Sequence, residues 1–303
     1  MKEILYKFDR GLRIFLSRQT LRKRDLGKKY LYCLRPIEYL TRKSFVNESS
    51  DKLLSDLSRD GISRNIEGMF KTQRLVEEAN DLFDRIMNLD QEISNLGEKP
   101  FLFKSLRNEE LHGSEIIKFA SSKKLLQTLT NYFGMAPIIE DIALWYSPNN
   151  RDIKGSSQLF HLDGQDVKTI QIFVYLDEVG AENGPLLAIT APESKKICKA
   201  VNYRKAPGVG RLSDTVISNF SPQVTMLTGK LGAAFVADTD RCLHAGSRKA
   251  NKPRKIMVFQ YITPFAFTLP HKYEKAAPFA RYARRDGFDS LQKLVLGCSS
   301  RDI

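Results

Sequence analysis

The character of the sequence changes at Gly134, and this change limits the possible folds more than any other feature of the chain. Upstream of Gly134, apolar residues recur at helical spacing. Downstream, short runs rich in branched and aromatic residues are separated by turn residues. These strand-like runs are 138–146, 169–176, 185–189, 223–227, 233–236 and 255–262. Many short strands after a helical start predict an α+β fold, with a helical layer packed on a β sandwich or barrel.

Two helical stretches before Gly134 are defined by apolar faces and end signals. One spans 74–89. Its apolar face consists of Leu75, Ala79, Leu82, Phe83 and Ile86. The other begins at Ser114, a good N-cap residue, and ends at Gly134, which suits a C-terminal cap. We expect this second stretch to break near Ser121 and Ser122.

The chain carries 48 Lys and Arg against 35 Asp and Glu, and a net charge of +13 at first suggests a nucleic-acid partner. The excess is local, however. Residues 1–50 hold 13 Lys and Arg against five acids, while 194–213 and 241–255 hold six each and no acid. The remainder of the chain is acidic, and no recognition helix or base-stacking pattern is evident. Nucleic acid is therefore not the expected partner.

Residues 1–30 combine many cations with apolar positions at helical spacing, among them Phe8, Leu12 and Phe15. A basic amphipathic helix of this kind fits peripheral contact with an anionic membrane surface. The alternative, a helix docked on the domain with its cationic face in water, is the preferred interpretation. Gly11 weakens the helix prediction in either case.

The four cysteines are irregularly spaced and include no C-x-x-C pair, so neither a disulfide scaffold nor a structural zinc site is predicted. No apolar run approaches the length of about 18 residues that a membrane span needs. The first 30 residues also lack the apolar region of a signal peptide. These features predict a soluble protein of the reducing cytoplasm.

Two of the four histidines have neighbours suited to metal binding. His161 and Asp163 form an H-x-D pattern, which on an extended strand places both side chains on one face. Taken alone, this pattern also fits a solvated turn. His244, at the end of the strand-like run 233–237, is a candidate third ligand, and two histidines with one carboxylate form the facial triad suited to non-haem Fe(II). His112 and His271 lack such neighbours and are predicted to be structural or exposed.

Arg254 follows His244 by ten residues and opens an apolar strand-like run. A planar guanidinium beside a metal is well suited to hold a remote carboxylate with two hydrogen bonds. Together with the three candidate ligands, Arg254 predicts a metal centre that uses a dicarboxylate co-substrate.

These residues and their surroundings resemble the phytanoyl-CoA dioxygenase-like family of Fe(II)/2-oxoglutarate-dependent oxygenases. The matching segments are Leu-Phe-His-Leu-Asp-Gly at 159–164, the strand-like run 170–176, Glu-Asn-Gly-Pro-Leu at 182–186, and the pair His244 and Arg254. The likeness covers roughly residues 55–264, and the basic start and the tail lie outside it.

The resemblance implies a double-stranded β-helix, a cupin-like jelly roll, with packed N-terminal helices. The corresponding organisation is a basic N-terminal segment at 1–50, a single oxygenase domain at 51–264 and a C-terminal extension at 265–303. Within the domain, we expect a helical layer at 51–135 and the jelly-roll core at 136–264.

The resemblance also implies iron held by His161, Asp163 and His244, with Arg254 binding the distal carboxylate of 2-oxoglutarate. With O2, such enzymes hydroxylate a substrate and release succinate and CO2, and ascorbate is a supporting reductant. Halogenating relatives carry a small residue in place of the carboxylate ligand, so Asp163 favours hydroxylation.

One position departs from the family pattern. Relatives often carry a hydroxyl residue two positions after the distal histidine, where this chain has Gly246. Ser247 is the candidate to replace that hydroxyl. Gln158 and Gln171 are further candidates for co-substrate contact, and the alternative for both is an ordinary amide that faces water.

We therefore expect a dioxygenase that hydroxylates a small organic molecule, whose identity the sequence does not encode. The cationic stretch 194–213 falls where loops cover the active-site mouth in the resembled fold. It either steers an anionic substrate or is a solvated loop. Two alternatives stay open: a non-catalytic jelly-roll protein that binds nucleic acid or acidic surfaces, and a metal-dependent sugar isomerase on a cupin-like barrel.

Overall fold

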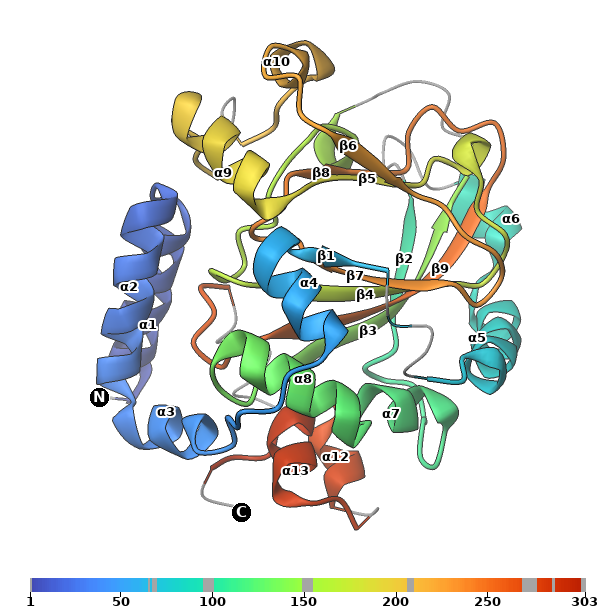
Figure 1. Cartoon of the computed structure of the whole chain (residues 1–303). Coiled ribbons are helices and arrows are strands. Elements are labelled where there is room, and N and C mark those ends of the chain that lie inside the picture. The colour runs from blue at the N-terminus through green and yellow to red at the C-terminus, as the bar shows by residue number, and fades with distance from the viewer. Residues whose placement is uncertain are drawn as a thin grey trace.

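Two antiparallel sheets face each other across the centre of the molecule (Figure 1). The computed structural model describes residues 2–64, 66, 70–94, 101–148, 155–205, 210–268, 277–284 and 287–300. The larger sheet has the strand order β1-β7-β4-β9-β3-β2. Its strands are β1 (Ile62–Ser63), β2 (Leu102–Ser105), β3 (Ile138–Ser147), β4 (Ile170–Tyr175), β7 (Ala234–Asp238) and β9 (Arg254–Ile262).

The smaller sheet has the strand order β6-β5-β8. Its strands are β5 (Leu186–Ile189), β6 (Val224–Leu227) and β8 (His244–Ala245). An isolated antiparallel bridge between His161 and His244 adds the segment around His161 beside β8. Because the chain passes back and forth between the two sheets, the architecture is a double-stranded β-helix, and the predicted fold is confirmed.

All six predicted strand-like runs form strands. They do so because alternate residues serve two different cores. On β4, Ile172 and Val174 pack against the helical layer, whereas Phe173 and Tyr175 point into the space between the sheets. The sequence pattern did not reveal β1, β2 or β8, which contain only two to four residues each.

Helices cover the outer face of the larger sheet (Figure 1). They are α4 (Lys52–Asp60), α5 (Gln73–Ile86), α7 (Glu115–Ala120), α8 (Lys123–Phe133), α12 (Ala280–Ala283) and α13 (Ser290–Leu296), and α6 (Leu89–Ser94) follows α5. The predicted end signals are confirmed. The hydroxyl of Ser114 accepts a hydrogen bond from the amide of Ile117, the chain breaks at Ser121 and Ser122, and Gly134 ends α8 with φ of 75°.

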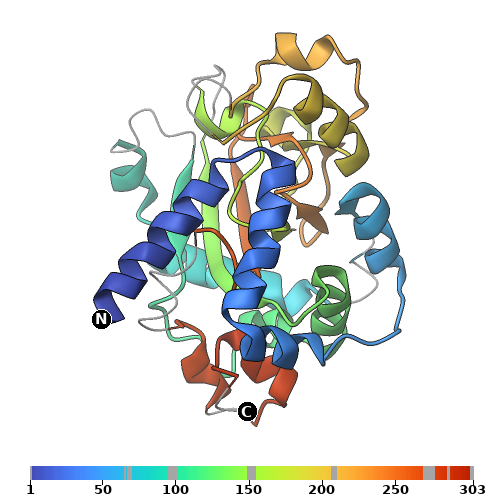
Figure 2. The same cartoon turned by 90° about the vertical axis from the view of Figure 1, so that its left-hand side faces the viewer.

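The N-terminal helices α1 (Lys2–Ser17), α2 (Leu21–Leu34) and α3 (Pro36–Lys43) lie along one side of the barrel (Figure 2). Gly11 does not interrupt α1, which runs unbroken through this position. None of the described helices is both long and apolar enough to cross a membrane. Phe8 and Phe15 remain exposed on the outer surface of α1.

Docking of α2 depends on two buried cations. Lys28 is 2% exposed and donates to the carboxylate of Asp166, which is itself buried. Arg24 is 3% exposed and pairs with the Asp240 carboxylate at 3.0 Å. The cations on this face of the segment therefore hold the helix on the core, whereas the sequence alone suggested a cationic face in water.

The cationic stretch that the sequence suggested as a mouth loop is partly helical. Its first half belongs to α9 (Ala191–Ala200), and α10 (Asp214–Ser218) follows it. Pro192 stands at the start of α9, and Ile197 and Cys198 pack into an apolar cluster with residues of the smaller sheet. This apolar face, hidden between lysines in the sequence, is why the segment forms a helix.

We predict that Lys28→Ala destabilises the protein by about 3 kcal/mol, because it leaves the buried Asp166 carboxylate without its cation. Lys29→Ala is the matched control, since Lys29 is the next residue and is exposed, and its change is expected to stay within about 0.5 kcal/mol. Urea unfolding of both variants measures the difference. Equal stability of the two variants would contradict the docking role of Lys28.

Candidate active site

His161, Asp163 and His244 converge between the two sheets. The ligand-type atoms of these three side chains all lie within 4.8 Å of one another. The Nε2 atoms of His161 and His244 are 3.6 Å and 3.5 Å from the Oδ1 atom of Asp163. Among the described residues, this is the one group of three or more such side chains with metal-binding spacing. The structure thus brings together the three residues that the sequence singled out as metal ligands.

Backbone pairing fixes the two histidines relative to each other. The amide of each donates to the carbonyl of the other at 3.0 Å, which is the closed pair of an antiparallel bridge. Asp163 belongs to the turn that follows, and its amide donates to the carbonyl of Thr239 at 3.0 Å. Gly164 then adopts φ of 70°, where a side chain would be strained and would also clash with the side chain of Lys205.

The hydrogen bond made by the Nδ1 atom of each imidazole ring determines the tautomer of that ring. The Nδ1–H of His161 donates to the carbonyl of Leu159 at 2.8 Å, and that of His244 donates to the carbonyl of Cys242 at 3.0 Å. Both Nε2 atoms are therefore free of hydrogen in the neutral rings and point toward Asp163. A backbone acceptor behind each imidazole is the usual arrangement for histidines that bind a metal.

Burial and charge set the ionisation of the triad. Burial lowers the pKa of His161, and the neighbouring His244 lowers it further. Burial would raise the pKa of Asp163, but the adjacent His244 and His161 hold it well below its usual range. Asp163 is therefore anionic and His161 neutral near pH 7, which are the states in which carboxylates and imidazoles bind metal ions.

A chain of amides supports the second carboxylate oxygen of Asp163. The Nε2 of Gln171 donates to Asp163 Oδ2 at 3.0 Å and lies 2.8 Å from Gln260 Oε1. Gln260 in turn donates to Gln165 at 2.7 Å and Glu140 at 2.8 Å. Gln171 thus orients a candidate ligand. It does not face water, which was the alternative for this residue.

Arg254 lies at the start of β9, buried between the sheets with 4% of its surface exposed. Its Nη2 is 2.8 Å from the hydroxyl of Ser247 and 3.4 Å from that of Ser147, which is its cross-strand partner on β3. Its Nε has no hydrogen-bond partner among the described residues, and no described acid pairs with it. Burial lowers the pKa of Arg254, but the side chain remains a cation.

Gly246 connects Arg254 to the histidine pair. A Cβ on Gly246 would lie 3.8 Å from Arg254 Nη2 and 3.4 Å from Leu186, so the guanidinium lies against the residue two positions after His244. Ser247 follows with φ of 55°, a left-handed conformation that is uncommon outside glycine. In this conformation its hydroxyl reaches Arg254, so Ser247 stays the candidate to replace the hydroxyl that position 246 lacks.

Gln158, which is not a member of the triad, holds the loop that contains Gly246 and Ser247. It is buried, and its Nε2 donates to the carbonyl of Ser247 at 2.7 Å. The amide of Ser247 donates to the carbonyl of Gly184 at 3.1 Å, and Asn183 donates to the carbonyl of Pro253 at 2.7 Å. Asn183 and Gly184 therefore hold both ends of the connection between β8 and β9, which contains Ser247.

Two site residues were missed from the sequence. Ser147 contacts Arg254 because the two residues are paired in the register of β3 and β9, and the sequence alone does not reveal this register. Lys205 donates to the backbone carbonyl of Asp163, although it comes from a cationic stretch with no positional signal. Cys242 is buried, and its thiol contacts the carbonyl of Asp60. His112 is exposed.

His271, the remaining histidine, lies outside the described residues.

Comparison with solved structures finds the same fold in EctD from S. alaskensis, crystallised with 2-oxoglutarate and 5-hydroxyectoine. The TM-score is 0.51 at 17% identity, covering 81% of this chain and 86% of that chain. The epimerase SnoN from nogalamycin biosynthesis aligns with a TM-score of 0.44 at 13% identity over 70% of this chain and 81% of that chain. AviO1 from Streptomyces viridochromogenes Tue57 aligns with a TM-score of 0.43 at 15% identity, over 73% of this chain and 98% of that chain.

The first of these comparisons supports the double-stranded β-helix fold. A scan of the sequence against protein-family models matches none of them, and a search of curated proteins also finds no match. The likeness to the phytanoyl-CoA dioxygenase-like family therefore stays a resemblance carried by the motifs quoted above.

We predict that Gln171→Met weakens metal binding by about 10- to 100-fold, because it removes the donor that orients Asp163 while keeping side-chain volume. Anaerobic titration with Fe(II) or Co(II) against a chromophoric chelator measures the affinity. Gln127→Met on α8 is the control, since the amide of Gln127 contacts Phe45 and Asn131. Unchanged affinity in Gln171→Met would show that Asp163 needs no support.

Proposed function

We propose that this protein is an Fe(II)- and 2-oxoglutarate-dependent dioxygenase that hydroxylates a small organic molecule. The observation that carries this proposal is the juxtaposition of two features in one barrel. A triad of two histidines and a carboxylate lies within 4.8 Å, and beside it lies a buried arginine that has no carboxylate partner among the described residues. The fold shared with EctD, a protein crystallised with 2-oxoglutarate, is consistent with this assignment.

The triad fits iron by the chemistry of its donors. Two imidazoles and one carboxylate suit Fe(II), and three protein ligands on one side leave positions for a co-substrate and oxygen. A fourth protein ligand would close the site. Cys242, two residues before His244, contacts the carbonyl of Asp60 and does not belong to the group.

Arg254 fits the distal carboxylate of 2-oxoglutarate. A buried guanidinium is expected to have an anionic partner, because an uncompensated charge away from water is costly. Here the protein offers only the hydroxyls of Ser147 and Ser247, and Arg254 Nε has no partner within the described part of the chain. A carboxylate at this place would complete the hydrogen bonding of the guanidinium. One hydroxyl of the hydrogen-bonded Ser147–Ser247 pair would be a further donor.

Iron, 2-oxoglutarate and O2 together supply the oxidising chemistry, in which the co-substrate becomes succinate and CO2 and the substrate gains a hydroxyl group. The chain supplies position and environment. Asp163 and the two histidines hold the metal, Gln171 keeps the carboxylate oriented, and Arg254 fixes the far end of the co-substrate. The apolar lining around Phe173 and Tyr175 excludes water from the space between the sheets.

An anionic substrate belongs to the same proposal. It is supported by Lys205 and Arg211, two cations of the stretch 194–213 that lie near the triad. Lys205 donates to the carbonyl of Asp163, and the charge of Arg211 adds to the lowering of the His161 pKa that burial mainly causes. A positive field at the site raises the encounter rate of negatively charged molecules.

We predict that the protein with Fe(II), ascorbate and 2-oxoglutarate forms succinate, and that His161→Ala abolishes this activity by removing a ligand. His112→Ala, which changes an exposed histidine before α7, is expected to behave as the wild type. Succinate is measured over a panel of substrates. If no substrate yields more succinate than the His161→Ala variant does, the non-catalytic binding function gains support.

We predict that Arg254→Lys raises the KM for 2-oxoglutarate about tenfold or more, because an ammonium cannot make the paired hydrogen bonds of a guanidinium. Metal affinity is expected to stay unchanged, since Arg254 is not a ligand. Lys255→Met is the control, because Lys255 points to the opposite face of β9, over the ring of Phe83. A fall in kcat with an unaltered KM would argue against co-substrate binding by Arg254.

A further inference from the structure

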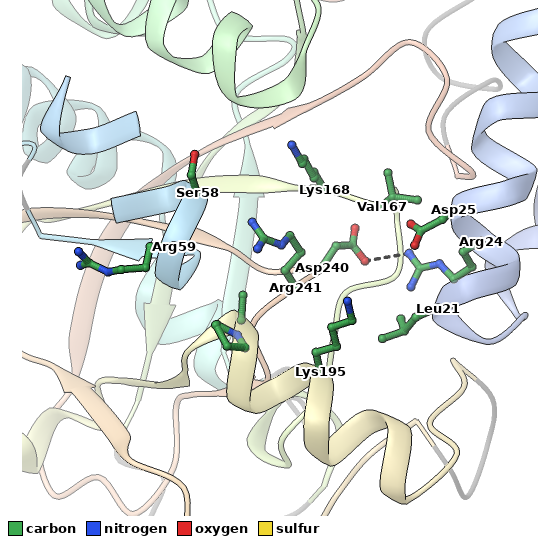
Figure 3. A pocket seen from close by; sticks show the side chains of 12 residues that line it. Leu21, Arg24, Asp25, Ser58, Arg59, Val167, Lys168, Lys195, Asp240 and Arg241 are labelled. Carbon is green, nitrogen blue, oxygen red and sulfur yellow. Dashed lines mark hydrogen bonds and ion pairs between the residues drawn. The ribbon is translucent and has the colours of Figure 1, made fainter. Parts of the chain in front are cut away.

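A second pocket lies away from the triad, between the N-terminal helices and the barrel (Figure 3). Its volume is about 520 Å³, and its walls come from α2, α4, α9, the segment before β4 and the turn after β7. None of the candidate iron or 2-oxoglutarate residues lines it. The pocket is built partly from the basic N-terminal segment, which the proposed function leaves without a role.

The lining of this pocket is strongly cationic, with five Lys and Arg against Asp25 and Asp240. Two of the five cations are neutralised within the protein. Arg24 pairs with Asp240 at 3.0 Å, and Arg59 pairs with Asp60 at 2.7 Å. The other three cations form no ion pair among the described residues, although the charge of Lys195 acts on Asp25 and those of Lys168 and Arg241 act on the buried Asp238 behind them. The lining of the pocket therefore keeps a cationic excess.

These three cations are Lys168, Lys195 and Arg241, and none has an ion-pair partner among the described residues. Arg241 donates to the hydroxyl of Tyr132 at 2.7 Å, and Lys168 donates to the carbonyl of the same residue, so both are held in place. Lys195 projects from α9 toward the same space (Figure 3). Three cations from three separate segments surround one volume.

Asp240 does not compete for these cations, because its carboxylate is saturated. Oδ1 accepts from Arg24 and the amide of Gly164, and Oδ2 accepts from the amide of Asp166 and the hydroxyl of Thr169. Arg24 also retains one buried nitrogen, Nε, without a partner in the described structure. The pocket therefore keeps positive charge that the protein itself does not neutralise, and a bound anion would neutralise it.

We propose that this pocket binds the phosphate group of a small organic phosphate ester. Cations that reach one space from three sides suit a tetrahedral oxyanion, which offers acceptors in several directions, better than a planar carboxylate. Leu21, Val167 and Pro192 form an apolar part of the wall, where the organic body of the ester packs. The volume accommodates a ligand of this size.

The pocket also adjoins the turn that carries Asp163, because Asp240 lines the pocket and contacts this turn. The carboxylate of Asp240 holds the amides of Gly164 and Asp166, and the carbonyl of Thr239 holds the amide of Asp163. A ligand in the pocket would therefore stabilise the turn that carries Asp163. Binding itself does not require the proposed iron chemistry, so the two proposals fail independently.

Isothermal titration of the full chain with EDTA present tests binding, using phenyl phosphate, inorganic phosphate and benzoate as probes. Phenyl phosphate is expected to bind more tightly than either of the other two. Lys195→Ala is expected to weaken it about tenfold or more, because one charge-assisted contact is lost. Lys196→Ala is the matched control, since Lys196 is exposed on the same helix but does not line the pocket.

His161→Ala is expected to bind phenyl phosphate as the wild type does, which separates this pocket from the triad. Three results would overturn the proposal. The first is no binding of phenyl phosphate beyond that of benzoate, and the second is equal affinity for inorganic and phenyl phosphate. The third is the same affinity in Lys195→Ala and Lys196→Ala.

Discussion

The buried carboxylate of Asp240 is the interaction on which the arrangement around the triad depends. Four donors from two segments of the chain meet on its two oxygens: Arg24 of α2, and Gly164, Asp166 and Thr169 of the segment before β4. In a low-dielectric interior, a carboxylate that lost one of these partners would be left partly unsatisfied, at a cost comparable to a large share of the stability of a domain. Because all four hydrogen bonds must form at once, Asp240 fixes the turn after Asp163, the start of β4 and the position of α2 relative to one another.

The candidate metal triad follows from this constraint and from one strand pairing. The mutual backbone hydrogen bonds of His161 and His244 place two imidazoles side by side on neighbouring strands. The rigid turn after His161 then returns Asp163 to the same space. Because the candidate ligands come from paired backbone and a clamped turn, the fold itself fixes their relative positions, which is the support that a functional site needs.

How much of this could be predicted from the sequence depends on how local each signal is. The strands, the helix caps at Ser114 and Gly134 and the candidate residues around His161 follow from patterns within a few neighbouring residues. The contact of Ser147 with Arg254 joins positions 107 apart and depends on strand register. Register is decided by packing of both faces of the sheet, and no short motif encodes it.

The charge of the N-terminal segment shows the other limit of sequence reasoning. A lysine in a basic stretch is normally solvated, and Lys28 carries no local mark that distinguishes it from Lys29. Its burial depends on Asp166, which lies 138 positions further along the chain. Removing residues 1–50 would therefore leave the carboxylates of Asp166 and Asp240 without their cations. On this argument the basic segment, which lies outside the family resemblance, is part of the same folding unit as the barrel.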